Sequence, residues 1–152
     1  MKFVVSSNTL LTRLQAVSKV IGGKPVQPIL DNILLVATEG VLYATASDKE
    51  TTMEARIELE SLEEEGKITI SAKILLDILK EFPEQPLTFE INTETNEVKI
   101  ISEKGEFSVP GESAEDYPIQ AALNDSSNDL TSKCGLILEG IVKTIFATAN
   151  DD

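Results

Sequence analysis

The stretch VSSNTLLTRL at residues 5–14 has a counterpart in ISAKILLDIL at residues 70–79. In both, an apolar residue and a serine precede two consecutive leucines, and a further leucine follows three residues later. Serine is favoured at the start of a helix, and apolar residues at this spacing share one helix face. Leu10 and Leu75 are 65 residues apart. The sequence therefore predicts a strand–helix unit that occurs twice.

A weaker third copy lies at residues 136–146. There Ile141-Val142 takes the place of the paired leucines, 66 residues after Leu75-Leu76. We therefore expect a new strand near residue 136 and a helix over residues 139–149, with no partner strands after it. This arrangement is typical of a fragment that contains the start of a further domain.

The two stronger copies predict amphipathic helices. The first spans about residues 8–21, is capped by Ser7 or Asn8 and ends at Gly22-Gly23. The second spans residues 72–82 and ends before Pro83. Their expected buried stripes are Leu10, Leu11, Leu14, Val17 and Ile21 in the first helix, and Ile74, Leu75, Ile78, Leu79 and Phe82 in the second.

Alternating apolar segments fill the intervals and predict strands at residues 29–38, 41–47, 51–59, 87–92, 97–102 and 106–109. The acidic run at residues 58–66 is interpreted as a solvated connection between the halves. The fold class is then α+β: duplicated β-α-β-β-β units, with two helices on one face of antiparallel sheets. We expect a first domain over residues 1–118 with halves 1–65 and 66–118, a linker over 119–131 and the start of a second domain over 132–152.

The composition excludes several classes of protein. The 152 residues include no histidine and one cysteine, Cys134, so neither an internal disulfide nor a cluster of Cys and His metal ligands can form. No apolar stretch approaches the roughly 18 residues of a membrane helix. A catalytic pair of carboxylates stays possible, but Cys134 has no partner histidine and no Gly-x-Ser-x-Gly motif occurs. We predict a cytoplasmic protein that is not an enzyme and has no cofactor.

The charge is distributed unevenly along the chain. Residues 1–30 carry Lys2, Arg13, Lys19 and Lys24 and no acidic residue, whereas the other 122 residues carry a net charge of −17, which gives −13 overall. Such asymmetry can place one basic surface on an acidic body. An ordinary solvated helix would produce the same pattern, so the charge alone leaves both interpretations open.

Several short motifs, taken in order, resemble those of the bacterial DNA sliding clamp, the beta subunit of DNA polymerase III. They are Met1-Lys2-Phe3, Leu10-Leu11-x-x-Leu14-Gln15-x-Val17, Gly22-Gly23-Lys24-Pro25 before Pro28-Ile29-Leu30, Ala46-Ser47-Asp48-x-Glu50 and Asp116-Tyr117-Pro118. The resemblance covers residues 1–118 closely and residues 132–152 loosely.

The resemblance implies the DNA clamp fold and a non-catalytic function. In that family two three-domain chains join head to tail in a ring around duplex DNA and tether the replicative polymerase. Helices line the central hole, where basic side chains contact phosphates without reading the base sequence. The polymerase and the clamp loader bind through the second and third domains. A protein-interaction module with a duplicated acidic domain and no DNA binding is the alternative.

The resemblance also suggests sites. The expected DNA-binding residues are Lys24, Arg13, Lys19, Lys73 and Lys80. Phe107 and Val109 match an aromatic and an aliphatic residue at the subunit joint of the ring, where Lys99 and Lys104 could add ion pairs. Glu106 stands where the family often has a basic residue, which weakens the electrostatic part of this expectation.

Overall fold

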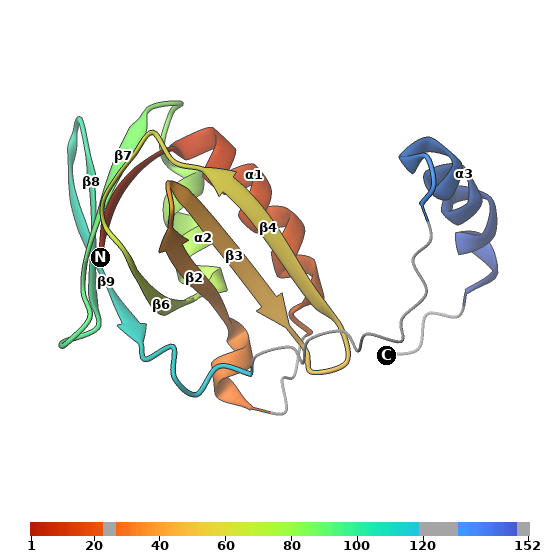
Figure 1. The fold of residues 1–152 in the computed structure, drawn as a ribbon, viewed down its shortest axis with the longest axis horizontal. Coiled ribbons are helices and arrows are strands. Elements are labelled where there is room, and N and C mark those ends of the chain that lie inside the picture. Colours follow the sequence, from red (N-terminus) through yellow and green to blue (C-terminus); the bar gives the residue numbers. More distant parts are fainter. Residues whose placement is uncertain (23–26, 119–130, 149–152) are drawn as a thin grey trace. The chain divides into compact units, whose positions relative to one another are not determined.

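A computed structural model of the chain describes residues 1–22, 27–118 and 131–148. The chain divides into two compact units, Met1–Gln120 and Ala121–Asp152, which are described separately below. Their elements are shown in Figure 1. Lys24 and nearly all of the expected linker lie outside the described residues.

The first unit is an antiparallel sheet with two main helices. In chain order its elements are β1 (Lys2–Ser6), α1 (Ser7–Val17), the 3-10 helices η1 (Ser18–Val20) and η2 (Pro28–Asp31), β2 (Asn32–Thr38), β3 (Val41–Ser47), β4 (Thr52–Glu58), β5 (Ser61–Glu64), β6 (Gly66–Ser71), α2 (Ala72–Lys80), β7 (Pro86–Asn92), β8 (Glu97–Ser102) and β9 (Gly105–Glu112). The strand order is β4-β3-β2-β6-β9-β8-β7-β1-β5.

The strand order shows how the two halves interlock. The run β4-β3-β2-β6 corresponds to the run β9-β8-β7-β1, and each run ends with the first strand of the other half. Thus β1 pairs with β7, and β6 pairs with β2. The expected duplicated unit is confirmed, and the exchange of first strands explains why neither half forms a separate domain.

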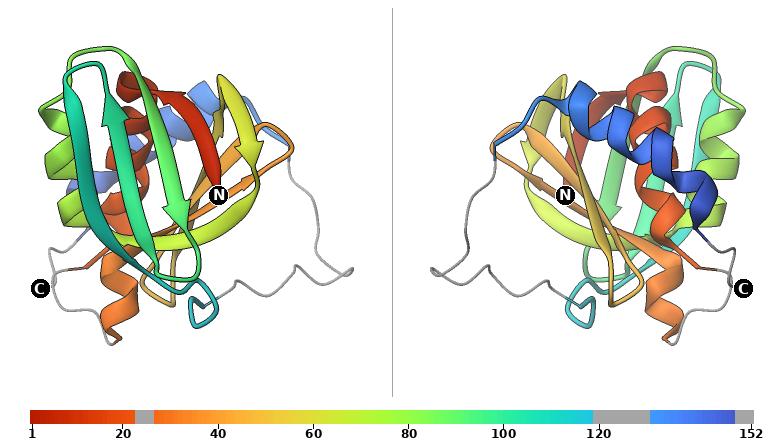
Figure 2. Two further views of the ribbon diagram at one scale, coloured as in Figure 1. Left: turned by 90° about the vertical axis from the view of Figure 1, so that its left-hand side faces the viewer. Right: turned by 90° about the vertical axis from the view of Figure 1, so that its right-hand side faces the viewer.

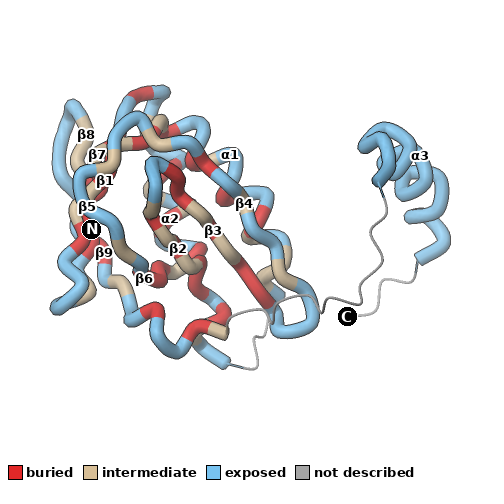
Figure 3. Tube along the Cα trace, in the orientation of Figure 1, coloured by how far each residue is buried: buried red, intermediate tan, exposed pale blue. Residues whose placement is uncertain are grey.

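The helices α1 and α2 contact each other and lie together against one face of the sheet (Figure 2). Ser6, rather than the expected Ser7 or Asn8, caps α1, because its side chain accepts a hydrogen bond from the Thr9 backbone N–H at 3.4 Å. Leu10 and Leu14 of α1 and Leu75 and Leu79 of α2 are fully buried. They pack into one core with the inward residues of the strands, which form the buried segments of Figure 3.

Three expectations about the elements of the first unit were wrong in detail. The first helix ends at Val17, and the chain continues as the 3-10 helix η1 over residues expected to be α-helical. The acidic run is not only a connection, because its residues Ser61–Glu64 form β5 on the edge of β1. In α2, Ile74 is 41% exposed, although its spacing placed it in the buried stripe.

The second unit contains α3 (Cys134–Thr144) and the 3-10 helix η3 (Ile145–Ala147). The helix starts five residues earlier than expected, and residues 131–148 contain no strand. Its large apolar side chains are at least half exposed: Leu136, Ile137, Leu138, Ile141, Val142, Ile145 and Phe146. In the part of the chain that the structure describes, no helix has the length and apolar character needed to cross a membrane.

Candidate nucleic-acid interface

The exposed side of the helix pair is basic. Because the leucine stripe of each helix faces the sheet, the intervening polar positions face outward. Across α1, η1 and α2 these positions include four basic residues and a single acidic one: Arg13, Lys19, Lys73, Lys80 and Asp77. All five are exposed. This face therefore carries a net positive charge on a chain whose overall charge is −13.

Lys19 and Lys80 lie together, although they come from different halves of the sequence. They line a hollow of about 470 Å³ between α1 and α2, together with Thr12, Gln15 and Leu76. The amine of Lys80 also forms an ion pair with Asp77 at 3.1 Å, one turn earlier on α2. The Asp77 carboxylate partly offsets the Lys80 charge, but exposed pairs of this kind contribute little free energy.

Arg13 does not join this pair. It lines a separate hollow of about 530 Å³ between α1 and the end of β4 with the residues that follow it, beside Arg56, Glu58 and Glu60. Glu60 of the acidic run therefore lies close to α1. The two carboxylates lower the positive potential around Arg13, so Lys19 and Lys80 form the more clearly cationic part of this face. Lys24 cannot be placed, because it lies outside the described residues.

The strands carry the opposite balance of charge. The nine strands contain eight acidic and four basic residues. On the face of the sheet away from the helices, Lys2 of β1 bridges Glu63 of β5 at 3.0 Å and Glu90 of β7 at 3.3 Å. Lys99 of β8 pairs with Glu106 of β9 at 3.2 Å. Since Glu90 and Lys99 are register partners, the charges alternate in sign across five strands. We call this series the outer-face ladder (Glu63, Lys2, Glu90, Lys99 and Glu106).

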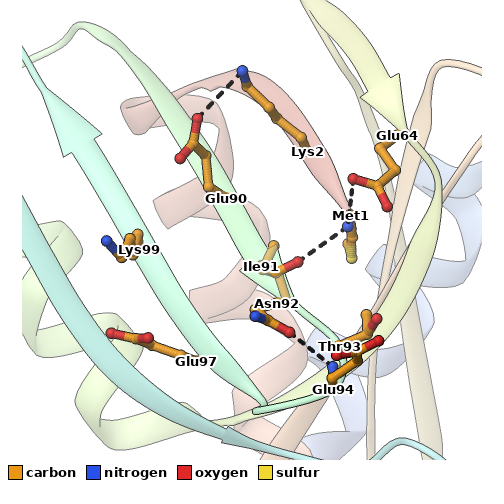
Figure 4. Close-up of a pocket in the computed structure, with 10 residues that line it drawn as sticks. All are labelled: Met1, Lys2, Glu64, Glu90, Ile91, Asn92, Thr93, Glu94, Glu97 and Lys99. Carbon is orange, nitrogen blue, oxygen red and sulfur yellow. Dashed lines mark hydrogen bonds and ion pairs between the residues drawn. The ribbon is translucent and has the colours of Figure 1, made fainter.

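The outer-face ladder affects the titration of its lysines. Hydrogen bonds to Glu63 and Glu90 raise the pKa of Lys2, and the hydrogen bond to Glu106 raises the pKa of Lys99. Figure 4 shows the adjoining hollow, where the amino group of Met1 donates to the Ile91 carbonyl at 3.1 Å and contacts Glu64 at 3.2 Å. Lys2 and Lys99 on this face are therefore already matched by carboxylates, which disfavours phosphate binding beside them.

The residues expected at the subunit joint separate into different environments. Phe107 is 44% exposed and meets Phe82 edge to face, with ring centroids 5.3 Å apart. Val109 is only 5% exposed and belongs to the core. Lys99 lies on the opposite face of the sheet in the outer-face ladder, and Lys104 is exposed in the turn before β9. Of the four, only Phe107 presents an exposed apolar side chain.

The sequence interpretation missed two residues that border these surfaces. Arg56 was not considered, because a single arginine in a strand carries no motif, and only the fold brings it beside Arg13. Phe82 was assigned to the core, but it is half-buried and packs against Phe107. Its position two residues after α2 ends, next to Pro83, could have suggested partial exposure.

The chain is similar to known proteins, and this similarity shows its family. The family model "DNA polymerase III beta subunit, N-terminal domain" matches residues 1–122. The chain belongs to this family. The beta sliding clamp of Vibrio harveyi is 36% identical over 119 residues, which cover 78% of this chain and 81% of that sequence. The beta sliding clamp of Vibrio cholerae is 34% identical over 154 residues, and the match covers 100% of this chain and 41% of the Vibrio cholerae protein.

A solved structure of a beta subunit agrees with the fold. The DNA polymerase III subunit beta from Pseudomonas aeruginosa matches with a TM-score of 0.88 at 27% identity, over 100% of this chain and 41% of that one. The chain thus spans about two fifths of the Vibrio cholerae and Pseudomonas aeruginosa proteins. The α+β clamp fold expected from the resemblance is confirmed.

Proposed function

We propose that this chain supplies the first domain, and the start of the second, of a sliding clamp that encircles duplex DNA. The observation that carries the proposal is the contrast between the basic helix-bearing face and the carboxylate-rich sheet. In a ring with the helices inward, Lys19 and Lys80 face the phosphates while the acidic sheet faces solvent. Contact with the backbone alone leaves the sequence unread, so the ring can slide.

The remaining parts of the proposal follow from family membership. The clamp acts in the cytoplasm as a head-to-tail homodimer, and it tethers the replicative polymerase without catalysing a reaction itself. The polymerase and the clamp loader bind through domains beyond this chain. Among the expected DNA-contacting residues, Lys24, Arg13 and Lys73 are retained in the proposal, with Lys19 and Lys80 as the central pair.

The exposed edge of β9 is the proposed subunit joint. Its first half pairs only with β8, since contact with β6 begins at Gly111. Phe107 stands at this free edge beside Phe82. An unpaired strand edge next to an aromatic side chain can bind another strand edge. Val109 supports this strand from inside the core. We give Lys99 and Lys104 a secondary role, because Lys99 already has an intramolecular partner.

The experiment that tests the DNA interface is fluorescence anisotropy with a short labelled duplex over a range of salt concentrations. The chain alone supplies few phosphate contacts, so we expect weak binding that falls steeply with salt. In a plot of log binding constant against log salt concentration, the slope becomes less negative by about 0.9 for each phosphate contact removed. Lys19→Glu and Lys80→Glu weaken binding, and the double variant weakens it further.

The matched control is Lys67→Glu, which makes the same charge change on an exposed strand residue of the opposite face. We expect Lys67→Glu to bind DNA almost as the unchanged chain does. Equal losses from all three reversals would show that net charge, rather than the helix-bearing face, governs binding. Salt-insensitive binding would contradict the phosphate mechanism and favour a protein-interaction module.

A further inference from the structure

The segment through which the chain leaves β9 is held at both ends. At its start, the Thr69 hydroxyl donates to the Glu112 carbonyl at 3.0 Å. At its end, Tyr117 is 2% exposed and its backbone N–H donates to the Ala114 carbonyl at 3.4 Å. In Figure 1 this segment follows β9 past the ends of β6 and β2. Nothing in the DNA interface or the subunit joint requires these contacts.

The Tyr117 hydroxyl occupies a gap in the β2–β3 ladder. The last pair of that ladder at this end joins Leu34 to Thr45. The Tyr117 hydroxyl lies 3.4 Å from the carbonyl of Asn32, which is two residues beyond this pair on β2, and 3.3 Å from the carbonyl of Thr45 on β3. It is thus a donor shared between the two strands. Buried carbonyls without a partner are costly, so this hydroxyl replaces a missing rung of the ladder.

The two ends of the segment are connected through buried polar side chains. Asn32 is 5% exposed and its amide nitrogen lies 3.5 Å from the Thr69 hydroxyl oxygen, while Thr69 is fully buried. Thr69 in turn holds Glu112. Burial raises the pKa of Tyr117, which keeps the hydroxyl protonated as a donor through the physiological range. Polar groups in a core contribute geometric specificity when their hydrogen bonds are satisfied.

We propose that hydrogen bonds from Tyr117 and Thr69 hold residues 112–117, the exit segment, against β2, β3 and β6, an arrangement that we call the clasp. Tyr117 is then a positioning residue for the part of the chain that follows Pro118. The clasp fixes the point and direction from which the next part of the chain departs. In a ring of domains this would limit the orientations of the second domain, a consequence that rests on the proposed function. The clasp itself does not depend on DNA binding.

The first test is amide hydrogen exchange on the full chain. Tyr117→Phe keeps the ring and removes only the hydroxyl. Because the two contacts are long, we expect exchange in residues 112–117 and at the ends of β2 and β3 to rise by about threefold to tenfold. Exchange in β7 and β8 stays unchanged. Thr69→Val shifts the increase toward Glu112, because it releases the other end of the segment.

The matched control is Tyr43→Phe. Tyr43 is half-buried on β3, and its hydroxyl makes no hydrogen bond within the part of the chain that the structure describes. This change leaves exchange in residues 112–117 unaltered. A uniform rise over the whole domain in Tyr117→Phe would make Tyr117 an ordinary core residue and overturn the proposal, as would no rise at all.

The second test measures the positioning effect directly. Cys134 is the only cysteine and is exposed, so a nitroxide attached there reports on the second unit without further mutation. Paramagnetic broadening of the first-unit amides changes its pattern in Tyr117→Phe and keeps it in Tyr43→Phe. An unchanged broadening pattern together with faster exchange would show that the Tyr117 hydrogen bonds act only locally. That result would overturn the proposed positioning role of Tyr117. Neither result bears on the Lys19 and Lys80 experiment, so the two proposals fail separately.

Discussion

The two halves of the first unit share a core and differ on their surfaces. Leu10 and Leu75 occupy corresponding positions 65 residues apart, and both are fully buried. At the same spacing, Arg13 corresponds to Ile78, and Gln15 corresponds to Lys80. Burial constrains both copies of the unit alike, whereas the exposed positions differ. The basic face is therefore assembled from both halves rather than repeated in each.

The strand edges differ in the same way. Ile57 of β4 and Val109 of β9 are the buried residues of the corresponding strands. Two residues before them stand Ala55 and Phe107, respectively. Only the second half presents an aromatic ring at its free edge. The corresponding strands of the two halves therefore present different side chains on the same backbone arrangement.

The largest effects are expected in the shared core. Leu10→Ala and Leu75→Ala each remove a fully buried side chain and leave a cavity, so each lowers the free energy of unfolding by about 2–5 kcal/mol. Urea denaturation measures both. Because the positions correspond, we expect the two losses to agree to within about 1 kcal/mol. A much smaller loss at one site would show that the halves are not equivalent in packing.

The core was the part that sequence alone could predict. The spacing of Leu10, Leu14, Leu75 and Leu79 determines both helices and their inward faces, because burial imposes a period that remains visible in the sequence. The exposure of Ile74 could not be predicted, because a helical period shows where the buried stripe lies but not how wide it is.

Other features were hidden for identifiable reasons. Ser61–Glu64 lacks alternating apolar residues, and backbone pairing with β1 makes it a strand. The start of α3 was misplaced because the short apolar run Leu136–Leu138 fits a strand or a buried helix equally well. Arg13 lies on α1 and Lys19 on η1, where they line different hollows, and the charge pattern does not reveal this separation.

A medium effect is expected at the aromatic edge. Phe107→Ala removes the edge-to-face contact with Phe82, worth about 0.5–1.5 kcal/mol beyond area burial, while most of the domain stays intact. Thermal unfolding monitors this loss. In a chain carrying all three domains, the same change is expected to weaken ring dimerisation measured by analytical ultracentrifugation. Ala55→Ser at the corresponding edge of the first half is the control and leaves dimerisation unaltered.

A smaller effect is expected from moving one lysine between the halves. Gln15 and Lys80 line the same hollow, so the double variant Gln15→Lys with Lys80→Gln keeps the charge in place while exchanging its source. We expect its affinity for a short duplex to stay within about twofold of the unchanged chain, because phosphate contacts depend on the position of the charge. Lys80→Gln alone weakens binding. A double variant as weak as the single one would show that Lys80 acts through its own geometry.

The smallest effect concerns the outer-face ladder, which has no counterpart on the helix-bearing face. Carboxylates hold the pKa values of Lys2 and Lys99 above the ordinary 10.5, so these lysines are more readily protonated in the folded chain than in the unfolded one. The resulting stabilisation is fully present below pH 10.5 and is lost as the pH rises through the folded pKa. Lys99→Met therefore lowers the unfolding temperature slightly near neutral pH, and the difference from the unchanged chain shrinks above pH 10.5. Tyr117 also titrates in this range, but it contributes equally to both proteins and cancels in the difference.

Lys67→Met provides the control, because Lys67 makes no ion pair among the described residues and we expect a difference that does not vary with pH. Added salt reduces the Lys99→Met difference as well, since exposed pairs are screened. If that difference persisted at both high pH and high salt, Lys99 would stabilise the sheet through the packing of its aliphatic stem, and the alternating charges would be a consequence of the strand pairing rather than a cause of it.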